Sequence, residues 1–356
     1  MTASPRIRVL VVDDSLTARK HIVEVLASDP GFEVVAEAAD GREAIELVGK
    51  HKPDVITMDM MLPVMTGLAA TEWIMAYCPT PIVVVSGSMN RGEVFRTYDA
   101  IAAGAVEVLP KPDAELNGAA WAAKLISILR IASRIKVVTH VRARLSRSPA
   151  SSGGIGPTAP PPSTAGVSLV TLGASTGGPG AVRRVLMDLP ASFSVPILLV
   201  LHIGAPFDVA LADWLDAQSP HRVGFAVDGE RLLDRPPRVL LAPAGRHMSL
   251  SQGRIRLDAG PERHSCRPSI DVLFESIAAE VGSSAAAVLM TGMGRDGADG
   301  LLAIRRAGGH TIAQDEASSV VYGMPRAAAE IGAASSILPL EAIGPALARI
   351  VKRGVR

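Results

Sequence analysis

Cysteine is scarce in this chain, which has only two among its 356 residues, Cys78 and Cys266. The two lie far apart and show no metal-ligand spacing, so the sequence predicts no disulfide framework. Scarce, unpaired cysteine is typical of proteins from a reducing compartment, where disulfides are rare. We therefore expect reduced thiols and a cytoplasmic location.

Long apolar runs are also missing. The longest wholly apolar strings, such as residues 195–201 (VPILLVL), are far shorter than the roughly 20 residues of a membrane-spanning helix. The first residues, MTASPRIRVLVVDDS, lack the apolar core of a signal peptide. The formal net charge is only +1, which gives no general argument for binding to nucleic acid or to a membrane. We expect no direct membrane insertion.

Length and composition indicate two domains joined by a tether. A chain of 356 residues exceeds what one hydrophobic core usually serves. Residues 146–166 (SRSPASSGGIGPTAPPPSTAG) are mostly Pro, Gly, Ser, Thr and Ala, and such a segment cannot bury a core. We predict a first domain at 1–145, a linker at 146–166 and a second domain at 167–356.

Both predicted domains alternate short β-branched runs with amphipathic segments, a pattern typical of parallel sheets covered by helices. Five strands are expected before the linker, at 7–12, 33–38, 54–58, 82–86 and 106–109. Five more are expected after it, at 167–174, 196–201, 238–242, 286–291 and 311–314. The first domain therefore fits a flavodoxin-like, doubly wound α/β fold, and the second a doubly wound, mostly parallel α/β fold.

A long basic helix is expected just before the linker. Residues 116–146 contain no acid and carry six basic side chains, Lys124, Arg130, Arg134, Lys136, Arg142 and Arg144. Such a helix can bind nucleic acid, dock an acidic partner or present a solvated face. Because no aromatic residues interleave with the basic ones, the sequence does not favour DNA binding.

Polar residues follow four expected strands of the first domain. They are Asp13 and Asp14 after the first strand, Asp59 after the third, Ser86 at the end of the fourth and Lys111 after the fifth. Ligands in open α/β sheets collect beyond the carboxyl ends of the strands. Clustered carboxylates repel one another and favour a divalent cation with oxygen ligands, here Mg²⁺. A lysine and a hydroxyl opposite them are suited to hold phosphoryl oxygens.

This half resembles the receiver domain of bacterial response regulators in the stretches VLVVDDS, PDVITMDMMLPVMTGL, PIVVVSG and LPKP. The resemblance implies that Asp59 accepts phosphate. It also implies Mg²⁺ ligands and phosphoryl contacts, which are Asp13, Asp14 and the Met61 carbonyl for the ion and Ser86 and Lys111 for the phosphoryl group. Val108 departs from the family pattern, because many receivers carry an aromatic switch residue at this position.

Ser175 in the second domain lies between two glycines, and its role is either to cap a helix or to act as a nucleophile. Residues 173–177 (GASTG) follow an expected strand and match the G-x-S-x-G pattern of a nucleophile elbow. Serine is also a favoured N-cap residue, and a helix is expected directly afterwards, so capping is the first interpretation of Ser175. The alternative is a nucleophile, which needs a base and an acid that orients the base.

His202 is the candidate base, because PILLVLH places it at the carboxyl end of an expected strand, on the same sheet edge as Ser175. Two loops offer the acid, which is Asp296 in AAAVLMTGMGRDG or Asp315 in HTIAQD. Spacing does not choose between them. The glycines around Asp296 favour it slightly, since they let backbone N–H groups approach a reacting centre.

Six motifs of the second domain resemble, in the same order, the catalytic domain of the chemotaxis protein-glutamate methylesterases, the CheB family. They are LGASTGGP, LHIGAPF, LLAPAGRHM, CRPSIDVLF, LMTGMGRDGADGL and AQDEASSVVYGMP. The resemblance implies that Ser175 is the nucleophile, His202 the base and Asp296 its orienting acid. It also implies that Met293 supplies a backbone N–H to the oxyanion hole, and that Asp315 has a supporting role.

The resemblance implies a phosphorylation-regulated serine hydrolase of bacterial chemosensory adaptation. Its substrates would be glutamyl methyl esters on chemoreceptors, with deamidation of glutamines as a related reaction and a chemotaxis histidine kinase as phosphodonor. Mg²⁺ is expected for phosphorylation and no cofactor for the ester chemistry. The alternatives are a response regulator whose second domain is a non-catalytic docking module, and a DNA-binding regulator. Neither alternative requires Ser175, His202 and Asp296 together.

Overall fold

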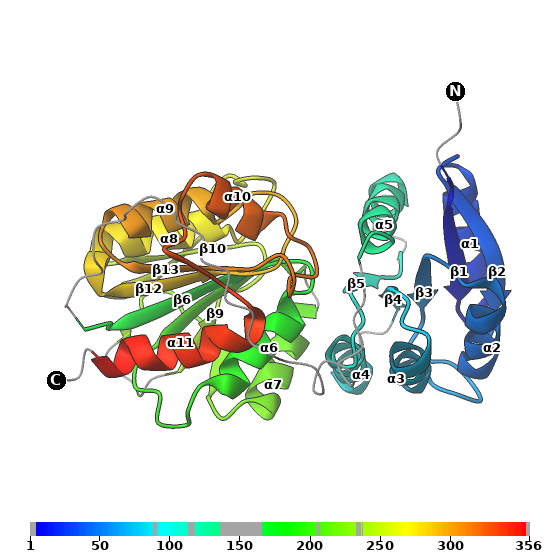
Figure 1. Cartoon of the computed structure of the whole chain (residues 1–356), viewed down its shortest axis with the longest axis horizontal. Coiled ribbons are helices and arrows are strands. Elements are labelled where there is room, and N and C mark those ends of the chain that lie inside the picture. Colours follow the sequence, from blue (N-terminus) through cyan, green and yellow to red (C-terminus); the bar gives the residue numbers. More distant parts are fainter. Residues whose placement is uncertain are drawn as a thin grey trace, which may run out of the picture. The chain divides into compact units, whose positions relative to one another are not determined.

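The computed structural model describes residues 5–87, 91–112, 118–135, 166–204, 207–232, 236 and 238–353. The chain divides into two compact units, 1–154 and 155–356, each with its own sheet and helices (Figure 1). The expected linker lies outside the described residues apart from Gly166, as does the basic helix beyond residue 135. No helix within the described residues combines the length and the apolar character needed to cross a membrane.

The first unit is a five-stranded sheet in the order β2-β1-β3-β4-β5, with every pair parallel. Its strands are β1 (Ile7–Val12), β2 (Phe32–Ala38), β3 (Val55–Met58), β4 (Ile82–Ser86) and β5 (Glu107–Pro110). Its helices are α1 (Leu16–Ala27), α2 (Gly41–His51), α3 (Gly67–Tyr77), α4 (Arg91–Ala102) and α5 (Gly118–Ala132). The order reverses beside β1, so the predicted doubly wound fold is confirmed.

Polar side chains start the helices that follow the strands of this unit. Ser15 accepts a hydrogen bond from the Ala18 N–H and caps α1, directly after the first strand. Thr66 accepts one from the Ala69 N–H at 3.2 Å and caps α3. Serine and threonine stabilise helix starts in this way, because the first N–H groups of a helix lack internal partners. Each of the loops that carry Asp13 and Asp59 therefore runs from the end of a strand to a capped helix start.

The second unit contains a seven-stranded parallel sheet in the order β14-β13-β12-β6-β7-β9-β8. Its strands are β6 (Leu169–Ala174), β7 (Ile197–Leu201), β8 (Val223–Phe225), β9 (Val239–Leu241), β12 (Ala285–Leu289), β13 (His310–Gln314) and β14 (Ser336–Leu338). A separate antiparallel hairpin consists of β10 (His247–Ser251) and β11 (Arg254–Asp258). The predicted second doubly wound fold is also confirmed, although the sequence pattern missed β8, β14 and the hairpin.

Helices cover both faces of this sheet. One face carries α8 (Ile270–Glu280), α9 (Ala298–Arg306) and α10 (Met324–Glu330), and the other carries α6 (Gly178–Asp188), α7 (Phe207–Gln218) and α11 (Leu340–Arg353) (Figure 1). The central strands β6, β7 and β12 are buried on both faces, which explains their almost wholly apolar sequences. The strand ends remain the place where polar side chains can meet.

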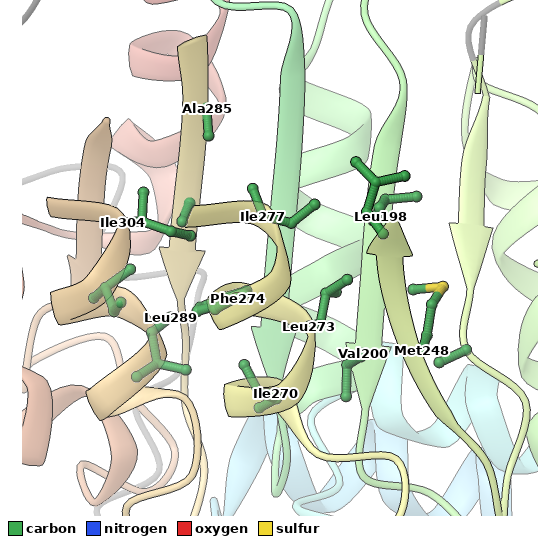
Figure 2. Close-up of a cluster of buried hydrophobic side chains, with 14 of the residues drawn as sticks. Leu198, Val200, Met248, Ile270, Leu273, Phe274, Ile277, Ala285, Leu289 and Ile304 are labelled. Atoms are coloured by element: carbon green, nitrogen blue, oxygen red, sulfur yellow. The ribbon is translucent and has the colours of Figure 1, made fainter. Parts of the chain in front are cut away.

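Helix α8 packs its apolar stripe against the sheet (Figure 2). The stripe follows the i, i+3, i+4, i+7 spacing of one helix face and is fully buried, and its members are Ile270, Leu273, Phe274 and Ile277. Ile270, the first residue of the helix, lies against β6, because a Cβ on Gly173 would come within 2.5 Å of Ile270 Cγ2. The packing therefore brings the N-terminus of α8 to the carboxyl edge of the sheet.

Truncation of this stripe should destabilise the protein. Ile277 is fully buried, so Ile277→Ala leaves a cavity and should lower the free energy of unfolding by about 2–5 kcal/mol. The matched control is Ile337→Ala on the edge strand β14, where the side chain is 50% exposed and the cost should be about 0.5 kcal/mol or less. Urea denaturation measures both. Equal losses would contradict this description of the core.

Candidate functional site

Ser175 follows β6 at the point where the strand order reverses. β6 pairs with β7 on one side and β12 on the other, and Ala174 lies opposite Leu201. The Ser175 N–H donates to the Thr291 carbonyl, just beyond β12, at 2.9 Å. The ends of three neighbouring strands therefore meet around Ser175, which is where open α/β sheets bind ligands.

Ser175 does not cap the helix that follows it, so the capping interpretation is wrong. Gly177, at φ 75°, occupies the N-cap position of α6, and no side chain caps this helix. The left-handed backbone at this position favours glycine. Within the described residues the Ser175 hydroxyl has no hydrogen-bond partner. The hydroxyl is therefore free to meet a substrate at the strand end.

Gly292 brings the loop after β12 close to Ser175. A Cβ on Gly292 would lie only 2.7 Å from the Ser175 Cβ, so no larger residue fits without a shift of the backbone. The next residue is Met293, whose side chain is 54% exposed and whose N–H has no acceptor in the described part of the chain. An unpaired N–H beside a serine is the type of donor that stabilises a developing oxyanion.

His202 follows β7 and binds Asp296 through Nε2. The backbone N–H of His202 donates a hydrogen bond to the Ala174 carbonyl at 3.1 Å, which holds His202 beside the strand that precedes Ser175. Nε2 lies 2.8 Å from Asp296 Oδ2, and Nδ1 lies 3.6 Å from Cys266 Sγ. No hydrogen bond joins Ser175 to the His202 ring in the described part of the structure. The structure thus joins base to acid, and it brings a thiol to the remaining ring nitrogen.

Asp296 is held by the N-terminus of α8. Its carboxylate accepts hydrogen bonds from the Ile270 N–H at 2.7 Å, the Asp271 N–H at 3.1 Å and the Ser269 hydroxyl at 2.7 Å. The free N–H groups and the positive end of the helix dipole stabilise an anion there. Burial raises the pKa of Asp296, but the hydrogen bonds from His202, Ile270 and Ser269 outweigh burial and hold that pKa below its usual range.

Asp315, the other candidate acid, has a different environment. Its carboxylate accepts hydrogen bonds from the Ser318 N–H at 3.0 Å and the Ser318 hydroxyl at 2.6 Å, within the turn after β13. Of the two candidate acids, Asp296 is the one that accepts a hydrogen bond from His202.

Asp296 and Cys266 raise the pKa of His202. Burial of the ring lowers this pKa, but hydrogen bonds and charge interactions with Asp296 and Cys266 outweigh burial and raise it to about 9. A general base must be neutral to accept a proton. The ring is therefore mostly protonated near neutral pH, and loses its proton as the pH approaches 9.

Two residues at this site were missed by sequence reasoning, although both lie in the motif CRPSIDVLF. Ser269 caps α8, and its hydroxyl donates a hydrogen bond to Asp296. A serine ahead of a helically spaced apolar run is a signal that predicts such a cap. Cys266 reaches His202 across 64 positions of sequence, and no local pattern predicts that contact.

The predicted phosphate-binding residues meet in the first unit. Lys111 Nζ lies 2.7 Å from Asp13 Oδ2 and 2.7 Å from Asp59 Oδ2, and both carboxylates are buried. Burial lowers the pKa of Lys111, but the two carboxylates outweigh burial and raise it. Burial raises the pKa of Asp13 despite the opposing lysine. One permanent cation thus balances two buried acids.

The same pocket fits a divalent cation and a phosphoryl group. Carboxylate oxygens of Asp13, Asp14 and Asp59 lie within 4.8 Å of one another, and oxygen donors of this kind suit Mg²⁺. Ser86 is 2% exposed, and its hydroxyl has no hydrogen-bond partner within the described residues. Buried hydroxyls are normally paired, so the Ser86 hydroxyl fits a phosphoryl group, whose oxygens accept hydrogen bonds. Met61 lies beside Asp59, because its backbone N–H donates a hydrogen bond to Asp59 Oδ1 at 3.3 Å.

The two units define a class of protein, a response regulator with an α/β hydrolase as its output unit. Protein-family comparison matches the response regulator receiver domain at residues 9–119 and the CheB methylesterase at residues 170–347. The chain belongs to the CheB family of protein-glutamate methylesterases, and the resemblance seen in its motifs is confirmed.

Full-length relatives share this architecture. The chain is 42% identical over 346 residues to protein-glutamate methylesterase/protein-glutamine glutaminase 2 of Anaeromyxobacter dehalogenans, with 97% of each chain covered. It is 43% identical over 348 residues to the protein-glutamate methylesterase/protein-glutamine glutaminase of Nitrosospira multiformis, again with 97% of each covered. The crystal structure of the Thermotoga maritima CheB methylesterase catalytic domain matches with a TM-score of 0.50 and 34% identity, covering 52% of this chain and 99% of that one.

The raised pKa of His202 can be measured directly. In an NMR titration the His202 ring should change protonation near pH 9, and Cys266→Ala should move the midpoint to lower pH because a group that raises the pKa is lost. Cys78→Ala, which alters the other cysteine in the first unit, should leave the midpoint unchanged. The His202→Gln spectrum assigns the signal. A wild-type midpoint near the ordinary value of about 6.5 would contradict the described environment.

Proposed function

We propose that this chain is a phosphorylation-regulated protein-glutamate methylesterase and protein-glutamine deamidase in which Ser175, His202 and Asp296 carry the chemistry. The observation that carries the proposal is the meeting of β6, β7 and β12 at Ser175, with His202 Nε2 and the buried Asp296 carboxylate bonded at 2.8 Å beside it. The names of the two full-length relatives supply the substrate class and the pair of reactions.

The reaction proceeds through an acyl-serine. Ser175 Oγ attacks the carbonyl carbon of a glutamyl methyl ester and gives its proton to His202. The imidazolium returns the proton to the departing alkoxide, and methanol leaves. Water, deprotonated by His202, then attacks the acyl-serine and releases glutamate and the free serine. With a glutamine side chain the same steps release ammonia. The Met293 N–H binds the oxyanion of each tetrahedral intermediate.

In the proposed mechanism the two ring nitrogens of His202 have distinct tasks. Nε2 is held by Asp296, so Nδ1 is the atom that exchanges protons with Ser175 in this ring orientation. In the free protein Nδ1 lies beside Cys266, and the serine approaches it when the substrate binds. Catalytic hydrogen bonds often tighten only in the substrate complex. The Asp296 anion stabilises the imidazolium that forms at each proton transfer.

The first unit accepts the regulatory phosphoryl group. Asp59 is the acceptor, Lys111 and Ser86 bind the phosphoryl oxygens, and the ligands for Mg²⁺ are Asp13, Asp14, Asp59 and the Met61 carbonyl. When bound, the ion neutralises the negative charge that the acids and the phosphoryl group bring together. Lys111 already pairs with Asp59 at 2.7 Å, so it is placed to follow that carboxylate when it is phosphorylated.

The proposed partners follow from these activities. The substrates are the cytoplasmic helices of methyl-accepting chemoreceptors, and the phosphodonor is a chemotaxis histidine kinase. A non-catalytic docking module does not explain a buried acid that is fixed by a helix N-terminus and hydrogen-bonded to a histidine, beside an unpaired serine hydroxyl.

We place the enzyme in the cytoplasm, where it acts on receptors without entering the membrane.

Loss of the nucleophile should abolish ester hydrolysis. We expect Ser175→Ala to reduce methanol release from a methylated receptor by about 10⁴-fold, because the acyl-enzyme cannot form. Asp296→Asn should also be severe, whereas Asp315→Asn is the matched control and should be mild. Circular dichroism checks that each variant is folded. More than a tenth of wild-type turnover in Ser175→Ala would exclude this serine, and a severe loss only in Asp315→Asn would exclude Asp296.

Phosphorylation should depend on Asp59 and on Mg²⁺. A small radiolabelled phosphodonor should label the wild-type protein only when Mg²⁺ is present, since the acid cluster repels a dianion without it. Asp59→Asn should remove the label. Asp54→Asn is the control, because this acid precedes the opposite end of β3, where it accepts a hydrogen bond from the Arg8 N–H. Wild-type labelling of Asp59→Asn would show that another residue accepts the phosphoryl group.

A further inference from the structure

A thiol and an imidazole nitrogen face each other in the active site. Cys266 Sγ lies 3.6 Å from His202 Nδ1 and 3.4 Å from the His264 carbonyl oxygen. Cys266 ends a tight turn that is closed by two backbone hydrogen bonds to Arg263, of 3.1 Å and 2.9 Å. The turn fixes the position of the sulfur beside the ring, and the proposed mechanism assigns no role to it.

The separation of these two atoms fits a tetrahedral metal ion. Zinc lies about 2.3 Å from a thiolate sulfur and about 2.0–2.1 Å from an imidazole nitrogen. With a tetrahedral angle between those bonds, the two ligand atoms are about 3.6 Å apart. Sγ and Nδ1 have this separation already. The separation of the two atoms therefore already matches that of two ligands on one zinc ion.

The other ring nitrogen has the partner that a metal-binding histidine normally has. Histidine ligands almost always donate their second N–H to a carboxylate or a carbonyl, which orients the free nitrogen toward the metal. His202 Nε2 lies 2.8 Å from Asp296 Oδ2, and α8 holds that carboxylate in place. His202, Cys266 and Asp296 also offer ligand atoms that lie within 4.8 Å of one another. Ligands and supporting acid are thus arranged before any ion arrives.

We propose that Cys266 Sγ and His202 Nδ1 form an inhibitory site for a thiophilic divalent ion such as Zn²⁺. This inference rests on the proposed function, because the ion occupies the nitrogen that takes the proton from Ser175. Binding to neutral His202 displaces the thiol proton to solvent, and a protonated ring releases a second proton. Water completes the coordination. A ring nitrogen bound to the ion cannot accept a proton, so ester hydrolysis stops until the ion leaves.

Cobalt provides a readout that is independent of activity. A thiolate bound to Co²⁺ gives a sulfur-to-metal charge-transfer band in the near ultraviolet, and the oxygen ligands of the first unit give none. The full-length protein should develop this band, and added Zn²⁺ should remove it. Cys266→Ser and His202→Ala should lack the band, whereas Cys78→Ser, the matched control, should keep it. A band that persists in Cys266→Ser, or its absence from the wild type, would overturn the site.

Inhibition provides the second readout, with methylated receptor as substrate and each variant compared with its own metal-free rate. Zn²⁺ should inhibit the wild type and Cys78→Ser, and a chelator should restore both. The half-inhibiting concentration should be at least about tenfold higher for Cys266→Ser. Equal inhibition of Cys266→Ser would overturn the metal site and leave the proposed function standing. A cobalt band in a protein without esterase activity would uphold the metal site and overturn the proposed function.

Discussion

The carboxylate of Asp296 at the N-terminus of α8 is the interaction on which the rest of the active site depends. A buried charge is costly unless hydrogen bonds compensate it, and here two backbone N–H groups, the Ser269 hydroxyl and the His202 ring surround it. The helix is in turn held on the sheet by its buried apolar stripe. The orientation of the His202 ring therefore follows from the packing of α8, through the carboxylate that the helix holds.

Each of the two sites pairs buried carboxylate charge with a positively charged side chain, and the side chain differs between them. In the first unit, Lys111 lies between Asp13 and Asp59 and stays charged, which suits a pocket that must accept a dianionic group. In the second unit, the positive group is an imidazole whose pKa is raised to about 9 and which can therefore lose its proton. Both sites lie at the carboxyl edge of a parallel sheet. One is arranged to hold charge, and the other to move protons.

Much of this arrangement can be predicted from the sequence, because strand periodicity locates the sheet edges and polar residues at those edges stand out. Both doubly wound folds are predicted in this way, and Asp59, Lys111, Ser175 and His202 are placed at the strand ends where the structure has them. The sequence could not choose between Asp296 and Asp315, since only tertiary packing brings α8 to one of them. The local pattern alone left capping as the first interpretation of Ser175, because a serine before a helix does not show which residue occupies the N-cap position. The strands β8 and β14 have three residues each and are only partly buried, so they show neither a period nor a buried apolar run.

The most direct test of the account identifies the nucleophile covalently. The Cys266 thiol lies beside the His202 ring, whereas Ser175 is the proposed nucleophile. An organophosphonate that reacts with activated nucleophiles should label the full-length protein once, and mass spectrometry should locate the adduct on Ser175. His202→Ala should lose the adduct, because the serine is then no longer activated. An adduct on Cys266, or no adduct on Ser175, would contradict the account.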